Sequence, residues 1–334
     1  MALGLGMIGC GRMAHELAGV IRDSVPEARL VAGYDTFAPS REAFRTAFGA
    51  APAESLEALL GREDVGAVLV ASPNSLHAEH TLAAAAAGKH VFCEKPMALS
   101  VKDCEAMLAA CREHGVKLMV GHSMRLAPPL RKLRELVASG ELGRPLYGIA
   151  QYWFSGFRPR ESGVWHRERA RSGGLFFQMA IHQIDVFHMV FGASRRVQYA
   201  GGRYGAQSKD FDDIGTILVG YESGATGAIA ASGIAPVASH EMAFLCSEGY
   251  AKLEGPWGRM EYGRDADHRT VIEADQFGGP GGVEMELMSF VNWVLHDAPP
   301  VLTAAEGRAA VAVAEAADRA RVEGAVRVGG DGTG

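Results

Sequence analysis

The chain has 334 residues, enough for two packed domains, and its 48% apolar and 22% charged residues are ordinary for a globular protein. A net charge of -6 gives no reason to expect nucleic acid as a partner, and no apolar run is long enough to span a membrane. The five cysteines form an odd set without CxxC spacing, which argues against a disulfide framework and a zinc site. Such cysteine usage suits a reducing compartment, and the N-terminus lacks the basic start of a signal peptide. We therefore expect a cytoplasmic protein that holds no metal and does not bind membranes.

A glycine-rich turn follows the first apolar run, residues 3–8, and precedes a helical pattern that ends near residue 23. Gly9 allows the tight turn, Gly11 lets the backbone approach a pyrophosphate, and Ala14 lets helix and strand pack closely. The free N–H groups at the start of the helix would then face the phosphates. We expect a dinucleotide to lie against this turn, which is formed by Gly9, Cys10, Gly11, Arg12 and Met13.

A second apolar run, residues 30–34, ends in Asp35. An acid about 20 residues beyond the glycine turn is placed to hydrogen-bond the adenosine ribose hydroxyls. Thr36 and Phe37 follow it where an arginine would favour NADP, so we expect NAD, although Arg41 is close enough to keep NADP open. The simpler alternative for Asp35 is an acid in a turn with no ligand.

The next buried-looking run, residues 67–71, leads into Ser72, Pro73 and Asn74. In open parallel sheets, ligands bind outside the carboxyl ends of the strands, so we expect these three residues and His77 to contribute to the cofactor site. His77 and His80 are one helical turn apart, but the sequence offers no third metal ligand nearby. We interpret His77 as a polar contact at a helix start and His80 as a surface residue.

Residues 90–93 form another apolar run, which ends in Glu94-Lys95-Pro96 ahead of a helix that starts at Ser100. A lysine at the carboxyl end of a strand can meet a cofactor on one side and a substrate on the other. The alternative is a surface lysine in a turn. Strands and helices alternate as far as residue 120, which predicts a parallel, doubly wound sheet.

Beyond residue 121 the pattern changes. One helix, from residue 129 to about 139, precedes longer alternating segments at residues 146–153, 197–203, 213–221, 225–232 and 241–246. Strands without intervening helices predict a mostly antiparallel sheet. We expect an α/β protein with a dinucleotide-binding domain (1–121), a substrate-binding and oligomerisation domain (122–328) and a flexible tail (329–334).

A second chemical stretch begins at Gly173 and Gly174, which end a loop before a helical pattern. On one continuous helix, Gln178, His182 and Asp185 would fall at i, i+4 and i+7 on one face. Hydride transfer at an alcohol needs a group that takes the hydroxyl proton, and a histidine has a suitable pKa. The simpler alternative for His182 is a structural histidine, and a metal site here is disfavoured because positions i+3 and i+6 do not converge on one ion.

Arginines are concentrated between residues 158 and 171: Arg158, Arg160, Arg167, Arg169 and Arg171. The simpler interpretation is a solvated or subunit-facing loop. The alternative is that one or two of them bind a carboxylate or phosphate of the substrate. The substrate contacts that we expect are Gln178, Asp185, Trp165, Arg167 and, earlier in the chain, Arg125.

In order and spacing, these motifs resemble the Gfo/Idh/MocA oxidoreductases, which include glucose–fructose oxidoreductase and inositol dehydrogenase. The resemblance covers nearly all of the chain, from Gly9-Cys10-Gly11 through Ser72-Pro73-Asn74 and Glu94-Lys95-Pro96 to Gly173-Gly174 and His182-x-x-Asp185. It implies a Rossmann domain, and a C-terminal α/β domain whose large open sheet assembles homodimers or homotetramers. It also implies NAD(P)-linked hydride transfer at a secondary alcohol of a sugar, glycoside, cyclitol or similar ring.

By this resemblance Lys95 would hold the reacting hydroxyl and lower its pKa, His182 would accept the proton, and Glu94 would orient Lys95 or touch the nicotinamide ribose. Many members carry an aspartate four residues before the histidine. Here that position is Gln178, which can hold a hydroxyl but cannot accept a proton. Two alternatives therefore stay open: a dehydrogenase of a cyclic dihydrodiol, with or without a carboxyl group, and an NAD(P)-binding sensor without catalysis.

Overall fold

The computed structural model describes residues 2–155, 165–205, 208 and 210–328. The chain forms two compact units, Met1–Ser123 with Val283–Arg308, and Met124–Gly282 with Ala309–Gly334. The expected division treated each domain as one continuous stretch, whereas Val283–Arg308 belongs to the first unit. The expected tail, residues 329–334, lies outside the described residues.

The first unit is built on a six-stranded parallel sheet in the order β3-β2-β1-β4-β5-β6. Its strands are β1 (Leu3–Ile8), β2 (Ala28–Tyr34), β3 (Ala51–Pro52), β4 (Ala67–Val70), β5 (His90–Glu94) and β6 (Leu118–Gly121). Every residue of β1, β4 and β6 is buried, as expected for a parallel sheet covered on both faces. The predicted doubly wound sheet is confirmed.

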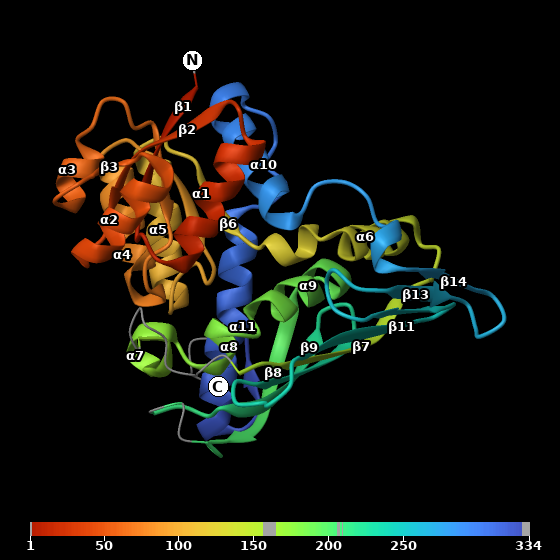
Figure 1. Ribbon diagram of the computed structural model, residues 1–334. Coiled ribbons are helices and arrows are strands. Elements are labelled where there is room, and N and C mark those ends of the chain that lie inside the picture. The colour runs from red at the N-terminus through yellow and green to blue at the C-terminus, as the bar shows by residue number, and fades with distance from the viewer. Residues whose placement is uncertain (1, 156–164, 206–207, 209, 329–334) are drawn as a thin grey trace. The chain divides into compact units, whose positions relative to one another are not determined.

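Helices connect these strands (Figure 1), and two of them start at serine caps. They are α1 (Arg12–Ser24), α2 (Ala38–Phe48), α3 (Leu56–Leu60), η1 (Asn74–Leu76), α4 (His77–Ala86) and α5 (Val101–Glu113). The later helix α10 (Gly282–His296) packs on this unit, since the Phe290 ring lies 5.7 Å from that of Phe92 and His296 contacts Glu27 at 3.0 Å. These contacts explain why a distant stretch of sequence joins the first unit.

The second unit contains a nine-stranded sheet in the order β14-β13-β12-β11-β7-β10-β9-β8-β15. Its strands are β7 (Pro145–Trp153), β8 (Ser194–Gly202), β9 (Ile214–Tyr221), β10 (Thr226–Ser232), β11 (Ser239–Cys246), β12 (Tyr250–Leu253), β13 (Met260–Gly263), β14 (Arg269–Ile272) and β15 (Val326–Arg327). Only the β7–β10 pair is parallel among the described strands of this sheet. The predicted, mostly antiparallel sheet is confirmed.

The remaining helical segments are η2 (Ser123–Leu126), α6 (Pro128–Ser139), η3 (Trp165–Arg167), α7 (Arg169–Ser172), α8 (Leu175–Gln178), α9 (Ile181–Phe191), η4 (Ala274–Gln276) and α11 (Ala304–Glu323). A capping box starts α11, because the side chains of Thr303 and Glu306 each accept a hydrogen bond from the other residue's backbone N–H. In the part of the chain that the structure describes, no helix is both long and apolar enough to cross a membrane.

The two faces of the nine-stranded sheet differ. One face packs against α8 and α9, where the rings of Phe187 and Phe191 lie so close to the strands that a Cβ at Gly227 or Gly148 would meet them at 2.6 or 2.8 Å. The opposite face leaves large apolar side chains exposed: Tyr147, Ile149, Leu218 and Leu245 are 41–53% exposed. We call these four residues the open-face stripe. Ile149 and Leu218 both pair with Ala228, so they flank a small side chain on the strand between them.

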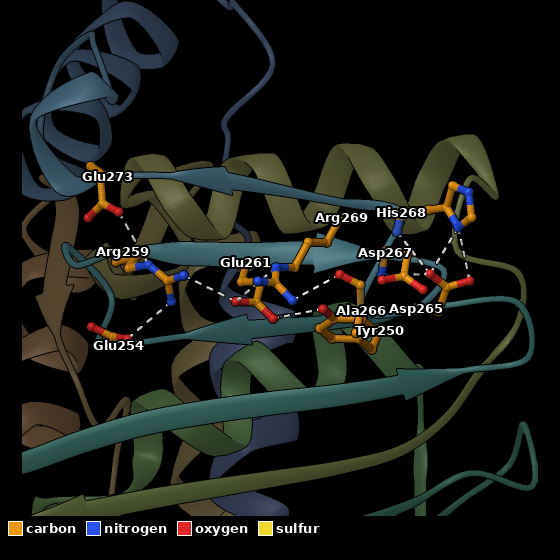
Figure 2. A network of polar contacts seen from close by, with 10 residues as sticks. All are labelled: Tyr250, Glu254, Arg259, Glu261, Asp265, Ala266, Asp267, His268, Arg269 and Glu273. Carbon is orange, nitrogen blue, oxygen red and sulfur yellow. Dashed lines mark hydrogen bonds and ion pairs between the residues drawn. The ribbon is translucent and has the colours of Figure 1, made fainter.

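A polar network lies on the short strands beside the stripe (Figure 2). Arg259 contacts Glu254, Glu261 and Glu273 at 3.3, 3.1 and 3.3 Å, and the Tyr250 hydroxyl donates to Glu261 at 2.7 Å. These contacts join β12, β13 and the segment after β14, in addition to the strand pairing.

Candidate active site

The glycine turn follows β1, which lies between β2 and β4 in the sheet of the first unit. Gly9 follows β1 with φ 87°, and a Cβ there would lie 2.7 Å from the Ser72 nitrogen, so the position accepts only glycine. Beside Gly11, in contrast, a Cβ would meet nothing within 4 Å. That open space next to the first turn of α1 fits the approach of a pyrophosphate to the backbone.

Asp35 is fixed beside this turn. Its carboxylate accepts hydrogen bonds from the Cys10 and Phe37 backbone N–H groups, both at 2.8 Å. Arg41, which kept NADP open, donates to the Asp35 carbonyl at 2.8 Å and to Glu54 at 3.1 Å. A guanidinium held in this way is already occupied, which supports NAD. Burial raises the pKa of the Cys10 thiol to about 12, so the thiol stays protonated and is no nucleophile.

The two histidines of α4 differ from their predicted places. His80 is 7% exposed, and its Nδ1 lies 2.9 Å from the Ser72 hydroxyl, so the prediction of a surface residue is wrong. The ring of His77 is 1% exposed, with Nδ1 2.7 Å from the Pro96 carbonyl and Nε2 2.9 Å from the Ser72 carbonyl. A ring enclosed in this way has no surface to offer a cofactor, and we correct the expected cofactor contact of His77. Ser72, Asn74 and the intervening Pro73 do lie at the carboxyl end of β4, as expected.

Lys95 is half-buried at the carboxyl end of β5, one strand from β4. Glu94 before it is 6% exposed, and its carboxylate accepts the Lys95 backbone N–H at 3.2 Å. Burial raises the pKa of Glu94, and the positive charge of Lys95 opposes that rise. A half-buried ammonium beside a buried carboxylate is a suitable group to hold a hydroxyl oxygen.

In the second unit, the predicted single helix is broken. α8 ends at Gln178 and α9 begins at Ile181, so Gln178 and His182 do not share one helical face. Gly173 and Gly174 precede α8 with φ of 82° and 84°, as expected for a glycine loop. Gln178 and His182 are each half-buried. Within the described ranges, no group of three or more His, Cys, Asp and Glu side chains could hold a metal ion.

Asp185 and Arg125, both expected to touch the substrate, instead face each other. Asp185 is 0% and Arg125 5% exposed, and the guanidinium donates to both carboxylate oxygens, Nε to Oδ2 at 2.7 Å and Nη2 to Oδ1 at 2.5 Å. The two side chains therefore anchor α9 to η2 and present no surface to a substrate. We therefore correct the expectation that these two side chains contact the substrate.

Of the arginine-rich stretch, Arg158 and Arg160 lie outside the described residues. Arg169 binds Asp318 at 2.8 Å, and the exposed Arg171 lies 3.9 Å from Glu168, which supports the simpler interpretation for both. Trp165 and Arg167 lie half-buried on η3.

Sequence reasoning missed the pair formed by Gln183 and His240. Gln183 follows His182 and is 0% exposed, and its Nε2 lies 2.7 Å from the His240 Nε2. Burial lowers the pKa of His240 to about 4, so its ring is neutral at pH 7. This contact links the first turn of α9 to β11. Nothing in an alternating strand pattern marks His240, so the sequence held no signal for it.

Two sequence profiles of one family match the chain. Residues 3–122 match that of the Gfo/Idh/MocA "oxidoreductase family, NAD-binding Rossmann fold", and residues 130–252 match the Gfo/Idh/MocA C-terminal domain.

Two named relatives are similar to the chain over most of its length. The chain is 29% identical over 367 residues to the 2,7-anhydro-N-acetylneuraminate hydratase of Mediterraneibacter gnavus, an alignment that covers 96% of this chain and 95% of the relative. It is 30% identical over 237 residues to the scyllo-inositol 2-dehydrogenase (NAD(+)) of Bacillus subtilis, with 69% and 67% covered. The crystal structure of the WlbA dehydrogenase from Bordetella pertussis in complex with NADH and UDP-GlcNAcA is similar, with a TM-score of 0.86 at 25% identity over 99% of this chain and 100% of that one. The chain belongs to the Gfo/Idh/MocA family of NAD-dependent sugar and cyclitol oxidoreductases.

Proposed function

We propose that this enzyme transfers a hydride between NAD and a secondary alcohol or ketone on a sugar, glycoside or cyclitol ring. The observation that carries the proposal is the half-buried Lys95 at the carboxyl end of β5, in the same unit as the Gly9–Gly11 turn and Asp35. Relatives named for an inositol and for an anhydrosugar acid support the substrate class.

In the proposed chemistry, two residues act on the reacting hydroxyl group. The Lys95 ammonium holds the hydroxyl oxygen and lowers its pKa, and His182 accepts the proton. The Gln178 amide holds a neighbouring hydroxyl but cannot take a proton. The nicotinamide of the bound cofactor supplies the hydride acceptor, or the donor in the reverse direction.

The test is a substrate screen that follows absorbance of the reduced nicotinamide. Sugars, glycosides, cyclitols and dihydrodiols are offered with NAD and then with NADP. Turnover of a ring polyol that prefers NAD is the expected result. Turnover confined to dihydrodiols would establish the alternative substrate class, and no turnover at all, with NAD binding intact by titration, would contradict the proposed substrates.

We further expect that Asp35→Asn raises the ratio of kcat/KM for NADP to kcat/KM for NAD by about 10- to 100-fold. The Cys10 and Phe37 N–H groups donate to different oxygens of Asp35, so the substitution keeps an acceptor for only one of them. It removes the charge that binds ribose hydroxyls and repels a 2′-phosphate, a difference of about 1.5–3 kcal/mol. Steady-state kinetics with both cofactors measure it, and an unchanged ratio would show that Asp35 does not face the ribose.

We also propose that the open-face stripe is a contact between identical subunits. Four large apolar side chains lie exposed on one sheet face, an arrangement typical of interaction sites, and the Arg259 network provides a polar rim beside them. Ile149→Glu is expected to shift the protein from dimer or tetramer to monomer in size-exclusion chromatography with light scattering. Val322→Glu, at an apolar residue 77% exposed on α11, is the control and should leave the mass unchanged.

We also propose that the protein is cytoplasmic. All five cysteines are buried and free, which is compatible with a reducing compartment.

A further inference from the structure

The buried ring of His77 joins two turns of the first unit. Its nitrogens lie within hydrogen-bond distance of the Ser72 carbonyl, just beyond β4, and of the Pro96 carbonyl, just beyond β5. These strands are neighbours, paired from Ala67↔His90 to Val70↔Cys93, and their ladder ends before either carbonyl. The ring therefore connects the turn after β4 to the turn after β5, beyond the last paired residues. The turn after β5 carries Lys95.

A single proton has to serve these two acceptors. The pKa of His77 is lowered to about 4, chiefly by burial and also by the charges of His80 and Lys95. The two carbonyl contacts act in the opposite direction and raise it. At neutral pH the ring is uncharged and carries one N–H, so it donates to only one carbonyl. The Pro96 contact is the shorter, 2.7 Å against 2.9 Å.

We propose that His77 is a positioning residue, whose Nδ1–H donates to the Pro96 carbonyl and thereby fixes the turn that presents Lys95. Pro96 directly follows Lys95, so the hydrogen bond holds the backbone at one side of the lysine while Glu94 accepts its N–H on the other. This inference rests on the proposed role of Lys95, and it adds the residue that holds the lysine in place.

Two substitutions of His77 distinguish the role of Nδ1 from that of Nε2. The amide nitrogen of His77→Asn lies near the position of Nδ1 and can still donate to Pro96, whereas that of His77→Gln lies near Nε2 and can reach only Ser72. His90→Gln is a matched control, because His90 accepts a hydrogen bond from the Lys117 N–H at the other end of β5. Thermal unfolding of each variant shows whether the fold is retained.

The first readout needs no cofactor. Acetylation of Lys95 by limiting acetic anhydride is followed by mass spectrometry, with Lys132 on α6 of the second unit as internal reference. In His77→Gln the relative rate at Lys95 should change by about tenfold, equivalent to one pKa unit, while His77→Asn and His90→Gln stay within about twofold of the native protein.

The second readout is kinetic. Since a displacement of about 1 Å can lower a rate 100-fold, kcat should fall by about 10- to 100-fold in His77→Gln with KM for NAD unchanged, and should be largely kept in His77→Asn. Equal behaviour of the two variants in both readouts would overturn the proposal, as would an altered kcat with unaltered Lys95 labelling. If neither variant folds, 15N shifts of the ring in the native protein decide, and a proton found on Nε2 contradicts it. Activity retained by a Lys95 variant would refute the proposed function instead, and would leave the labelling result standing.

Discussion

Replacing Lys95 by methionine is expected to lower kcat by about 10³-fold, the middle of the range that a positioned acid–base group contributes. Methionine has a similar length and still packs in a half-buried position, but it can neither hold the hydroxyl oxygen nor lower its pKa. Loss of the ammonium also removes the charge that opposes the raised pKa of Glu94, so this carboxyl becomes easier to protonate. The measurement is single-turnover hydride transfer with the best substrate from the screen.

The NAD dissociation constant controls for damage to the cofactor site. It should change by less than about threefold, because the glycine turn and Asp35 are held by other contacts. Lys95→Arg keeps the charge but enlarges the head group, and should recover little of the activity. Full activity in Lys95→Met would mean that the lysine is a surface residue of a turn, the alternative that its sequence position left open.

The first unit could be predicted nearly whole because each strand of a doubly wound sheet is a compact apolar run bounded by glycine or polar residues. The strand missed in it, β3, has only two residues. In the second unit β12 to β14 were missed because each has four residues and places charged side chains such as Lys252 and Glu261 outward. The place of α10 depends on contacts with Phe92 and Glu27, which no local pattern records.

The candidate site was predictable in its motifs and less so in its contacts. Spacing identified Lys95, His182 and the glycine turn as residues at strand and helix ends, but it could not show the break between α8 and α9 or the burial of His77. Asp185 and Arg125 looked like substrate ligands because charge in an apolar stretch indicates either a ligand or an ion pair. Because the two residues are 60 positions apart, the sequence does not show that they form an ion pair.

That ion pair should be the most sensitive point of the second unit. Arg125→Met or Asp185→Leu leaves one charge buried without its partner. Each substitution is expected to lower the free energy of unfolding, measured by urea titration, by about 3–5 kcal/mol. The double substitution removes both charges and restores apolar packing, so it should be markedly more stable than either single variant. Because Asp185 lies one turn after His182 on α9, the singles should also lose hydride transfer at temperatures where they are still folded, and the double variant should regain part of it. Two singles that each lose less than about 1 kcal/mol, with losses that simply add in the double, would show that water reaches the pair and that α9 is anchored by its apolar contacts instead.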